Sequence, residues 1–440
     1  MYAMDQNGYP PPYSNASDLT PGLRIPMPPR SDDEGASERS RFGLGVSIQP
    51  NEPDADRRIQ LLQDAGVRWW RQEFSWAEVE SSPAQFDWSR WDAIVSTAER
   101  HGASVLPVLM HEPRWVGIDT RDAVDAFARF AGAAAERYRG RVKYWQIWHE
   151  PNTKAWDSTP GQYARFLVAA SQAIREADPN AKVLGLNTAL ADVQWIEKIL
   201  RLIPYDSFDV LALHPNRPPN DPEERSDLWF RDSLRGDDPL AREDLSGQIE
   251  AVQRLMVVRG SLKPIWITDI CWFAHTDPYG VTGLRQADLL VRAYVYAAAC
   301  RVEKVFWRAL ADGDGGAGTG AGLCSADLVP RYAYYAYSWM THLLEGKRLM
   351  GMPIRRRDTF AAAFTDGRSE VVVAWTTRPY AYILVDTRQQ LELYDVFGGR
   401  QVVSVDQTRT RSVCIPLSPS PVYITGPAGI SVRWAPEPGW

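Results

Sequence analysis

Two short apolar segments of the chain each end in a carboxylate. Tyr144–Asn152 reads YWQIWHEPN and carries Glu150, and Pro264–Trp272 reads PIWITDICW and carries Asp269. Apolar runs of this length are typical of buried parallel strands. A carboxylate at the carboxyl end of such a strand opens into the mouth of a barrel, where catalytic groups gather. Two facing carboxyl groups are what cleavage of a sugar acetal requires, so the pair suits chemistry on a glycosidic bond.

The two acids would have different roles in such a reaction. One carboxylic acid protonates the leaving oxygen, while a carboxylate acts on the opposite face of the sugar ring. Glu150 suits the acid, because it follows an apolar strand and Pro151 forces an extended exit from that strand. Asp269 then becomes the nucleophile. No cofactor is expected, since the chain supplies both carboxylates, and no zinc, calcium, P-loop or dinucleotide pattern is visible.

The elements that must position these acids follow a regular alternation from Phe42 onward. Amphipathic helices fall between eight candidate strands; one helix has Tyr163, Phe166 and Ile174 on one face, and another starts at Ser89 with a weak capping box at Asp92. This order predicts an α/β fold, a (β/α)8 TIM barrel. The candidate strands are Gly43–Ile48, Val67–Arg71, Ser104–Met110, Val142–Trp148, Lys182–Leu186, Asp209–Leu213, Pro264–Thr268 and Lys304–Trp307.

The segments before and after the predicted barrel differ from it in composition and in hydrophobic pattern. Residues 1–40 are rich in Pro, Ser, Asp and Glu and are predicted to be a disordered lead, with the barrel spanning 41–346. Residues 347–440 give short alternating strands between Gly- and Pro-bearing turns, which predicts a small antiparallel β-sandwich. Pro215–Asp244 is a long charged insertion after the sixth strand, and the Gly-rich Asp312–Gly322 is expected to form a mobile flap.

Composition narrows the classes of partner. The 440 residues carry a net charge of -6, which gives no reason to expect nucleic acid or an anionic membrane as partner. The start of the chain lacks the pattern of a signal peptide, and no apolar run approaches membrane-spanning length, so a cytoplasmic protein is expected. The cysteines are far apart and predict free, mostly buried thiols. Eighteen Trp and 18 Tyr suit either large aromatic cores or flat platforms for sugar rings. Oligomeric state is left open.

From about residue 42 onward the chain resembles glycoside hydrolases of clan A, most closely family 39 and its relatives. In that clan the fourth strand ends in Asn-Glu-Pro, with the Glu as acid/base, and the seventh ends in a Glu nucleophile. The resemblance implies a β-glycosidase acting on a β-linked oligosaccharide or glycoside, with a carbohydrate as ligand. The matching strings are WHEPN, GVRWWRQEFSW (Gly66–Trp76), DVLALHP (Asp209–Pro215), VFWRAL (Val305–Leu310) and GLCSADLVPRYAYYAY (Gly322–Tyr337).

The resemblance also assigns substrate-binding roles. Arg71 matches the second-strand Arg that orients the nucleophilic carboxylate, and Trp307 matches the platform under the sugar at the cleavage point. His111 and His214 lie at strand ends and are expected to contact sugar hydroxyls, with a satisfied core histidine as the alternative for each. Trp272 is a further candidate for stacking on sugar.

Three positions depart from the clan pattern. His149 stands where the clan usually has Asn, Asn216 follows His214-Pro215 where Tyr is common, and Asp269 replaces the nucleophilic Glu. The shorter acid withdraws its carboxylate by roughly 1–1.5 Å. Retaining pairs lie about 5–5.5 Å apart and inverting pairs about 6.5–9.5 Å apart, so the change moves the pair toward the gap between the two mechanisms.

Three outcomes follow from the shorter acid. The first is a retaining enzyme with adjusted backbone. The second is inversion, or use of a substitute acid such as Glu73 or Glu112, although each of these could instead form a salt bridge with a loop Arg. The third is a carbohydrate-binding pseudoenzyme of the same fold. Retention is the favoured outcome, and the pseudoenzyme is the main alternative.

Overall fold

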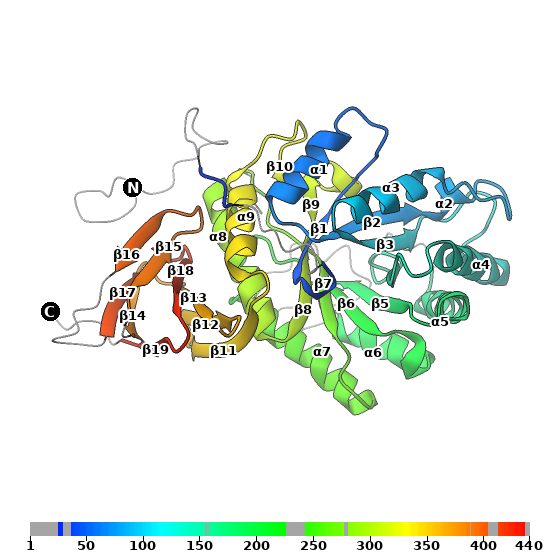
Figure 1. The fold of residues 1–440 in the computed structure, drawn as a ribbon. Helices are drawn as coiled ribbons and strands as arrows, with labels where there is room; N and C mark the ends of the chain where they lie inside the picture. The colour runs from blue at the N-terminus through cyan, green and yellow to red at the C-terminus, as the bar shows by residue number, and fades with distance from the viewer. Residues whose placement is uncertain are drawn as a thin grey trace.

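Eight parallel strands close into a barrel in the order β1 to β8, with helices around it (Figure 1). The computed structural model describes residues 25–29, 37–154, 156, 158–225, 243–276, 280–387, 389–403 and 412–435. The barrel strands are β1 (Phe42–Gly45), β2 (Trp69–Ser75), β3 (Ser104–Met110), β4 (Tyr144–Ile147), β5 (Lys182–Ala189), β6 (Val210–His214), β7 (Ile265–Ile270) and β8 (Val302–Trp307). The predicted TIM barrel is confirmed, and each predicted strand overlaps an observed one.

The helices cover the outside of the barrel. They are α1 (Ala55–Asp64), α2 (Trp76–Val79), α3 (Ser89–Arg100), α4 (Arg121–Arg137), α5 (Pro160–Ala177), α6 (Val193–Leu202), α7 (Leu245–Arg259), α8 (Gly283–Ala299) and α9 (Tyr332–Leu344). The predicted face of α5 packs inward, since Tyr163, Phe166 and Ile174 are fully buried. Among the described residues, no helix combines the length and apolar character that crossing a membrane needs.

The amino-terminal end of the barrel is closed by an aromatic cluster around a buried lysine. The Lys304 ammonium lies 4.7 Å from the centre of the Trp69 ring and donates to the Ser40 carbonyl at 2.7 Å. Burial lowers the pKa of Lys304 to about 8. Ser37–Arg39 forms a short 3-10 helix here, so the last residues of the predicted disordered lead are ordered, while most of that lead lies outside the described residues. The opposite end of the barrel is therefore the one available for a site.

Two antiparallel sheets follow α9, as the predicted β-sandwich requires, and the predicted boundary at 346 falls between α9 and β11. One sheet has the order β11-β12-β13-β18-β15-β16 and the other β17-β14-β19. The strands are β11 (Arg348–Arg355), β12 (Thr359–Thr365), β13 (Ser369–Thr376), β14 (Ala381–Asp386), β15 (Leu391–Tyr394), β16 (Arg400–Val403), β17 (Ser412–Leu417), β18 (Val422–Pro427) and β19 (Ser431–Trp434). Helices α8 and α9 lie between the barrel and these sheets (Figure 1).

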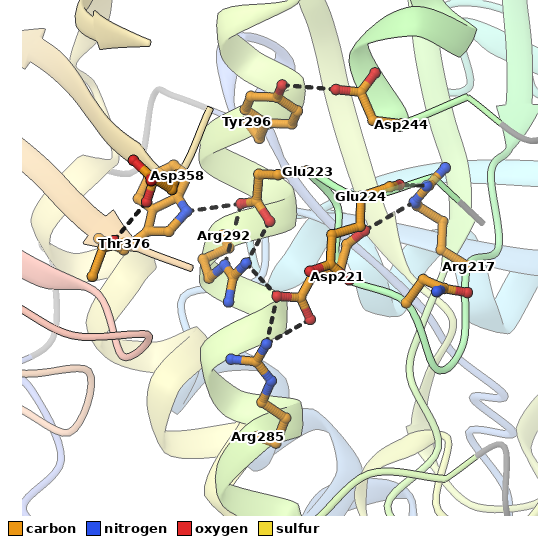
Figure 2. Close-up of polar contacts among 12 residues, drawn as sticks. Arg217, Asp221, Glu223, Glu224, Asp244, Arg285, Arg292, Tyr296, Asp358 and Thr376 are labelled. Carbon is orange, nitrogen blue, oxygen red and sulfur yellow. Dashed lines mark hydrogen bonds and ion pairs between the residues drawn. The ribbon is translucent and has the colours of Figure 1, made fainter. Parts of the chain in front are cut away.

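A buried ionic network joins the two parts (Figure 2). Arg292 on α8 is fully buried and pairs with Asp221 at 2.6 Å and Glu223 at 2.5 Å, both from the segment after β6. Glu223 also accepts a hydrogen bond at 2.8 Å from the Trp375 indole on β13, and Asp221 pairs with Arg285. The network therefore connects the sandwich, α8 and the β6–α7 segment. Most of the remaining predicted insertion, residues 226–242, lies outside the described residues.

One local prediction is wrong. Helix α3 begins at Ser89 as expected, but it has no capping box. Asp92 instead accepts hydrogen bonds from Arg137, the last residue of α4, and from Tyr138, which follows it. The Gly-rich segment Asp312–Gly322, which is predicted to be a mobile flap, has hydrogen bonds near both of its ends. Asp312 accepts from the backbone of Gly320 and Gly322 and pairs with Arg331, and Asp314 pairs with Arg58 at 2.8 Å.

Candidate active site

The backbone at the carboxyl ends of β3 and β4 is unusual. Trp148 and Glu150 have φ angles of 65° and 45°, and His111 has a φ of 62°. Left-handed backbone is uncommon for residues other than glycine, and it clusters at functional sites. The strain therefore points to the mouth of the barrel at β3 and β4 as a place where side-chain direction matters.

The segment after β4 is fastened to β5, which fixes the direction of Glu150. The Glu150 amide donates to the Asn187 carbonyl at 3.1 Å. The Asn152 side chain donates to the Ala189 carbonyl at 3.0 Å and accepts from the Ala189 amide at 2.9 Å. The Asn of the WHEPN string therefore acts as a staple between adjacent strand ends rather than as a ligand-binding group.

Glu150 is hydrogen-bonded to a neutral histidine. Its Oε1 lies 2.9 Å from His214 Nδ1, and His214 Nε2 lies 2.9 Å from the Thr268 hydroxyl on β7. Burial lowers the pKa of His214 to about 3, so the imidazole is uncharged at neutral pH. Burial raises the pKa of Glu150, and the negative charge of Asp269 raises it further. A carboxyl group with a raised pKa and a side chain 21% exposed suits a proton donor.

His149 is oriented by Arg71. The Arg71 guanidinium donates to His149 Nδ1 at 3.0 Å and to the Gln146 side chain at 3.4 Å. Arginine is only a donor, so Nδ1 must accept and the neutral ring carries its hydrogen on Nε2. Burial holds the pKa of His149 well below its usual range. His149 Nε2 therefore carries the ring hydrogen, and it lies 4.0 Å from Glu150 Oε2, beyond hydrogen-bond distance.

Asp269 is held by an arginine that sequence analysis did not single out. Its Oδ2 accepts from Arg308 at 2.7 Å, and Arg308 directly follows β8. The other oxygen, Oδ1, is buried and has no hydrogen-bond partner among the described residues. The whole Asp269 side chain is only 2% exposed. A buried carboxylate oxygen without a donor is costly, and in a native site such an atom calls for a functional explanation.

His149, His214 and Asp269 could be mistaken for a metal site. Their potential ligand atoms lie within 4.8 Å of one another. However, Arg71 occupies His149 Nδ1, both ring nitrogens of His214 have hydrogen-bond partners, and the Arg308 guanidinium is paired with Asp269. A cation there would take a ring nitrogen of His214 out of its hydrogen bond and would lie beside the positive charges of Arg71 and Arg308, so the donor set fits a hydroxylated neutral ligand better than a metal.

Solved structures share this architecture. A family 39 glycoside hydrolase from Bacteroides cellulosilyticus WH2 superposes with a TM-score of 0.74 at 20% identity, covering 88% of this chain and 81% of that one. The family 39 β-xylosidase of Caulobacter crescentus gives a TM-score of 0.60 at 15% identity, covering 88% and 96%. A family 30 endoxylanase from Clostridium papyrosolvens C71 gives 0.62 at 14% identity, covering 89% and 97%.

The chain has the fold of the family 39 glycoside hydrolases. No family model matches it. Aryl-phospho-β-D-glucosidase BglA of Bacillus subtilis is 26% identical over 143 residues, which are 30% of this chain and 29% of that enzyme. The match therefore spans less than a third of that relative's length. The resemblance predicted from the sequence is confirmed at the level of the fold.

On this family fold, several predicted site residues converge and others do not. Glu150, His149, His214, Asp269 and Arg71 lie together at the barrel mouth. The family pattern implied that Arg71 orients the carboxylate of Asp269, but the hydrogen bonds of its Nε and Nη2 go to Gln146 and His149. Arg308 takes that place.

The predicted aromatic platforms and the outer residues differ from expectation. Trp272 and Trp307 are fully buried, with ring centroids 6.3 Å apart, and donate to the Asn220 and Ala321 carbonyls, so neither presents an open face in this structure. His111 is exposed and its Nε2 lies 4.0 Å from Glu73. Glu112 is exposed.

Three contributors were not predicted: Arg308, Gln146 and Thr268. Arg308 and Thr268 lie at the carboxyl ends of β8 and β7, so their position alone was a usable signal. No sequence signal marked Gln146, because its place inside the barrel depends on the register of β4 against β3.

Proposed function

We propose that the protein hydrolyses β-linked glycosides, with Glu150 as general acid and base and Asp269 as nucleophile. The observation that carries this proposal is the state of the Asp269 carboxylate, with one oxygen held by Arg308 and the other buried without a donor. A sugar hydroxyl or the reacting carbon would supply the missing partner. The fold of family 39 glycoside hydrolases and the raised pKa of Glu150 support the same assignment.

The first step forms a covalent intermediate. Glu150 gives its proton to the glycosidic oxygen as the bond from that oxygen to the anomeric carbon breaks. Asp269 Oδ1 bonds to the same carbon from the opposite face, which leaves Glu150 ionised and Asp269 as a glycosyl ester. Because His149 and His214 are neutral, they place no positive charge beside Glu150 that would lower its pKa.

The second step regenerates both acids. Ionised Glu150 takes a proton from water, and the water oxygen bonds to the anomeric carbon as the ester bond to Asp269 breaks. Asp269 returns to its pair with Arg308, and Glu150 is protonated again. Two displacements on one carbon give a product with retained configuration.

A second candidate function is carbohydrate binding without turnover. The observation that favours it is the low exposure of Asp269, whose side chain is 2% exposed and paired with Arg308. Such a protein would bind sugar through Glu150, His149 and His214 and would release it unchanged.

A panel of aryl β-glycosides with poor, unactivated leaving groups, with Glu150→Gln as the blank, tests the proposal. Turnover of at least one glycoside that is lost in Glu150→Gln supports a glycosidase. The sugar of the glycoside that is hydrolysed then gives the substrate class. Absence of turnover above the blank on the whole panel, together with calorimetric binding of a sugar, favours the second candidate.

A further inference from the structure

We propose that Arg308, the residue directly after β8, positions the carboxylate of Asp269. The two residues act as a pair, in which the arginine compensates for the shorter side chain of the aspartate. The inference rests on the proposed function and goes beyond it by assigning a role to Arg308. On this account, the aspartate is not a defect of the site. Its shorter side chain leaves the space that the guanidinium occupies.

The backbone that carries Arg308 is fixed by three strands. Arg308 directly follows Trp307, the last residue of β8, and its amide donates to the Ile270 carbonyl at the end of β7 at 3.1 Å. Gly45 on β1 lies so close that a Cβ built there would be 1.8 Å from the Arg308 carbonyl oxygen. The guanidinium therefore starts from a defined position next to Asp269, as an orienting group must.

The contact of Arg308 with Asp269 is short and involves only one of the two carboxylate oxygens. Arg308 bonds only Oδ2, at 2.7 Å, and leaves Oδ1 without a partner among the described residues. The charge of Asp269 in turn raises the pKa of the Arg308 guanidinium, which stays protonated throughout the working range. Without Arg308, neither oxygen of this buried carboxylate would have a donor to define its direction.

Arg71 lies near enough for its charge to act on Asp269, but its hydrogen bonds go elsewhere. Its Nε and Nη2 donate to Gln146 and His149. A glutamate at position 269 would extend the carboxylate by roughly 1–1.5 Å. Because Arg308 Nη1 lies only 2.7 Å from the aspartate oxygen, the longer acid would have to displace the guanidinium. Lengthening the acid alone should therefore impair the site, even though glutamate is the residue usual in the clan.

Kinetics of four variants on the best aryl β-glycoside test the pair: Arg308→Gln, Arg308→Lys, Asp269→Glu, and the double variant Asp269→Glu/Arg308→Gln. We expect Arg308→Gln to lower kcat on the order of 100-fold with KM changed by less than about threefold, since misplacement by about 1 Å has that effect. Arg308→Lys should lose less, because it keeps the charge. The double variant should be at least about tenfold faster than Asp269→Glu alone.

Arg58→Gln is the matched control. Arg58 on α1 pairs at 2.8 Å with Asp314, which, like Arg308, follows β8. Because Arg58 touches none of the proposed catalytic groups, kcat of Arg58→Gln should stay within about twofold. Circular dichroism and thermal melting check that each variant folds. If Arg308→Gln does not fold, the test rests on the kcat of Arg308→Lys and on whether the double variant is faster than Asp269→Glu.

The possible failures are distinguishable. Wild-type kcat in Arg308→Gln, or a double variant whose losses simply multiply, overturns the pairing of Arg308 with Asp269 while leaving the glycosidase proposal intact. Inactivity of the unmodified protein on every glycoside overturns the proposed function and this inference with it.

Discussion

At the scale of single residues, the site separates two carboxylic acids by their surroundings. Glu150 lies among neutral imidazoles and its pKa is raised, chiefly by burial. Asp269 is held by a permanent cation at 2.7 Å. One acid is therefore kept as a proton donor and the other as a directed carboxylate, which is the division of roles that acetal cleavage needs.

The pH dependence of kcat/KM follows from Glu150. A general acid works only while it is protonated, so activity should fall as pH rises through the pKa of Glu150. Because that pKa is raised, the basic limb of the profile should lie above the ordinary glutamate value of 4.5. Glu150→Gln should lower kcat about 10²–10⁴-fold on substrates with poor leaving groups.

The leaving group provides the control for this pH prediction. An activated aryl group leaves without full protonation, so Glu150→Gln should retain much more of the wild-type rate on such a substrate, and its basic limb should disappear. A wild-type profile whose basic limb is unchanged in Glu150→Gln would assign that limb to another group.

At the scale of elements, the barrel strands could be predicted because parallel strands covered on both faces are continuous apolar runs. The strand β3 (Ser104–Met110) was located to the residue. The missed features are those that depend on which distant side chains meet. Asp92 was expected to cap its own helix, and contacts from Arg137 and Tyr138 override that local preference.

The same limit applies to the candidate site. Sequence predicted that Glu150 and Asp269 meet, because both end strands of one barrel. It could not predict that Arg308 instead of Arg71 would bind Asp269, since this depends on the pairing of β7 with β8 and on Arg71 being engaged by His149. Nor did it predict that Trp272 and Trp307 would be fully buried against each other.

Gly45→Ala tests how β1 supports β8. An added Cβ would meet the Arg308 carbonyl oxygen at 1.8 Å, so the backbone of Arg308 must move. We expect a loss of about 1–3 kcal/mol in the free energy of unfolding, measured with denaturant, and a lower kcat. Gly161→Ala is the control: its nearest neighbouring atom would be 3.8 Å away, and in helix α5 alanine should be neutral or stabilising by up to about 1 kcal/mol. Equal stability of the two variants would contradict this packing argument.

At the scale of the whole molecule, the sandwich is joined to the barrel through charged groups that are almost completely buried. Arg292 and Glu223 have side chains 0% and 1% exposed. Buried pairs of this kind add little over apolar packing, but removal of one partner leaves an uncompensated charge. The segment after β6 that carries Glu223 also carries Asn220, whose carbonyl accepts from the Trp272 indole at 2.9 Å. The network thus links the sandwich to the region behind Asp269.

Glu223→Gln should therefore destabilise the protein by about 3 kcal/mol in denaturant unfolding, because Arg292 loses one of its two anions. Glu136→Gln is the matched control, since its pair with Arg139 is exposed and should contribute less than about 1 kcal/mol. A stability of Glu223→Gln equal to that of the control would show that the network does not fasten the sandwich.

The most direct test of the central claim is to trap the covalent intermediate with a 2-deoxy-2-fluoro aryl β-glycoside of the sugar that the panel identifies. The fluorine slows the second step more than the first, and mass spectrometry of the digested protein locates the attached sugar. We expect one sugar per chain, attached to Asp269 and absent from Asp269→Asn. Attachment to Glu73 or another acid, or steady turnover with no attached sugar, would contradict it.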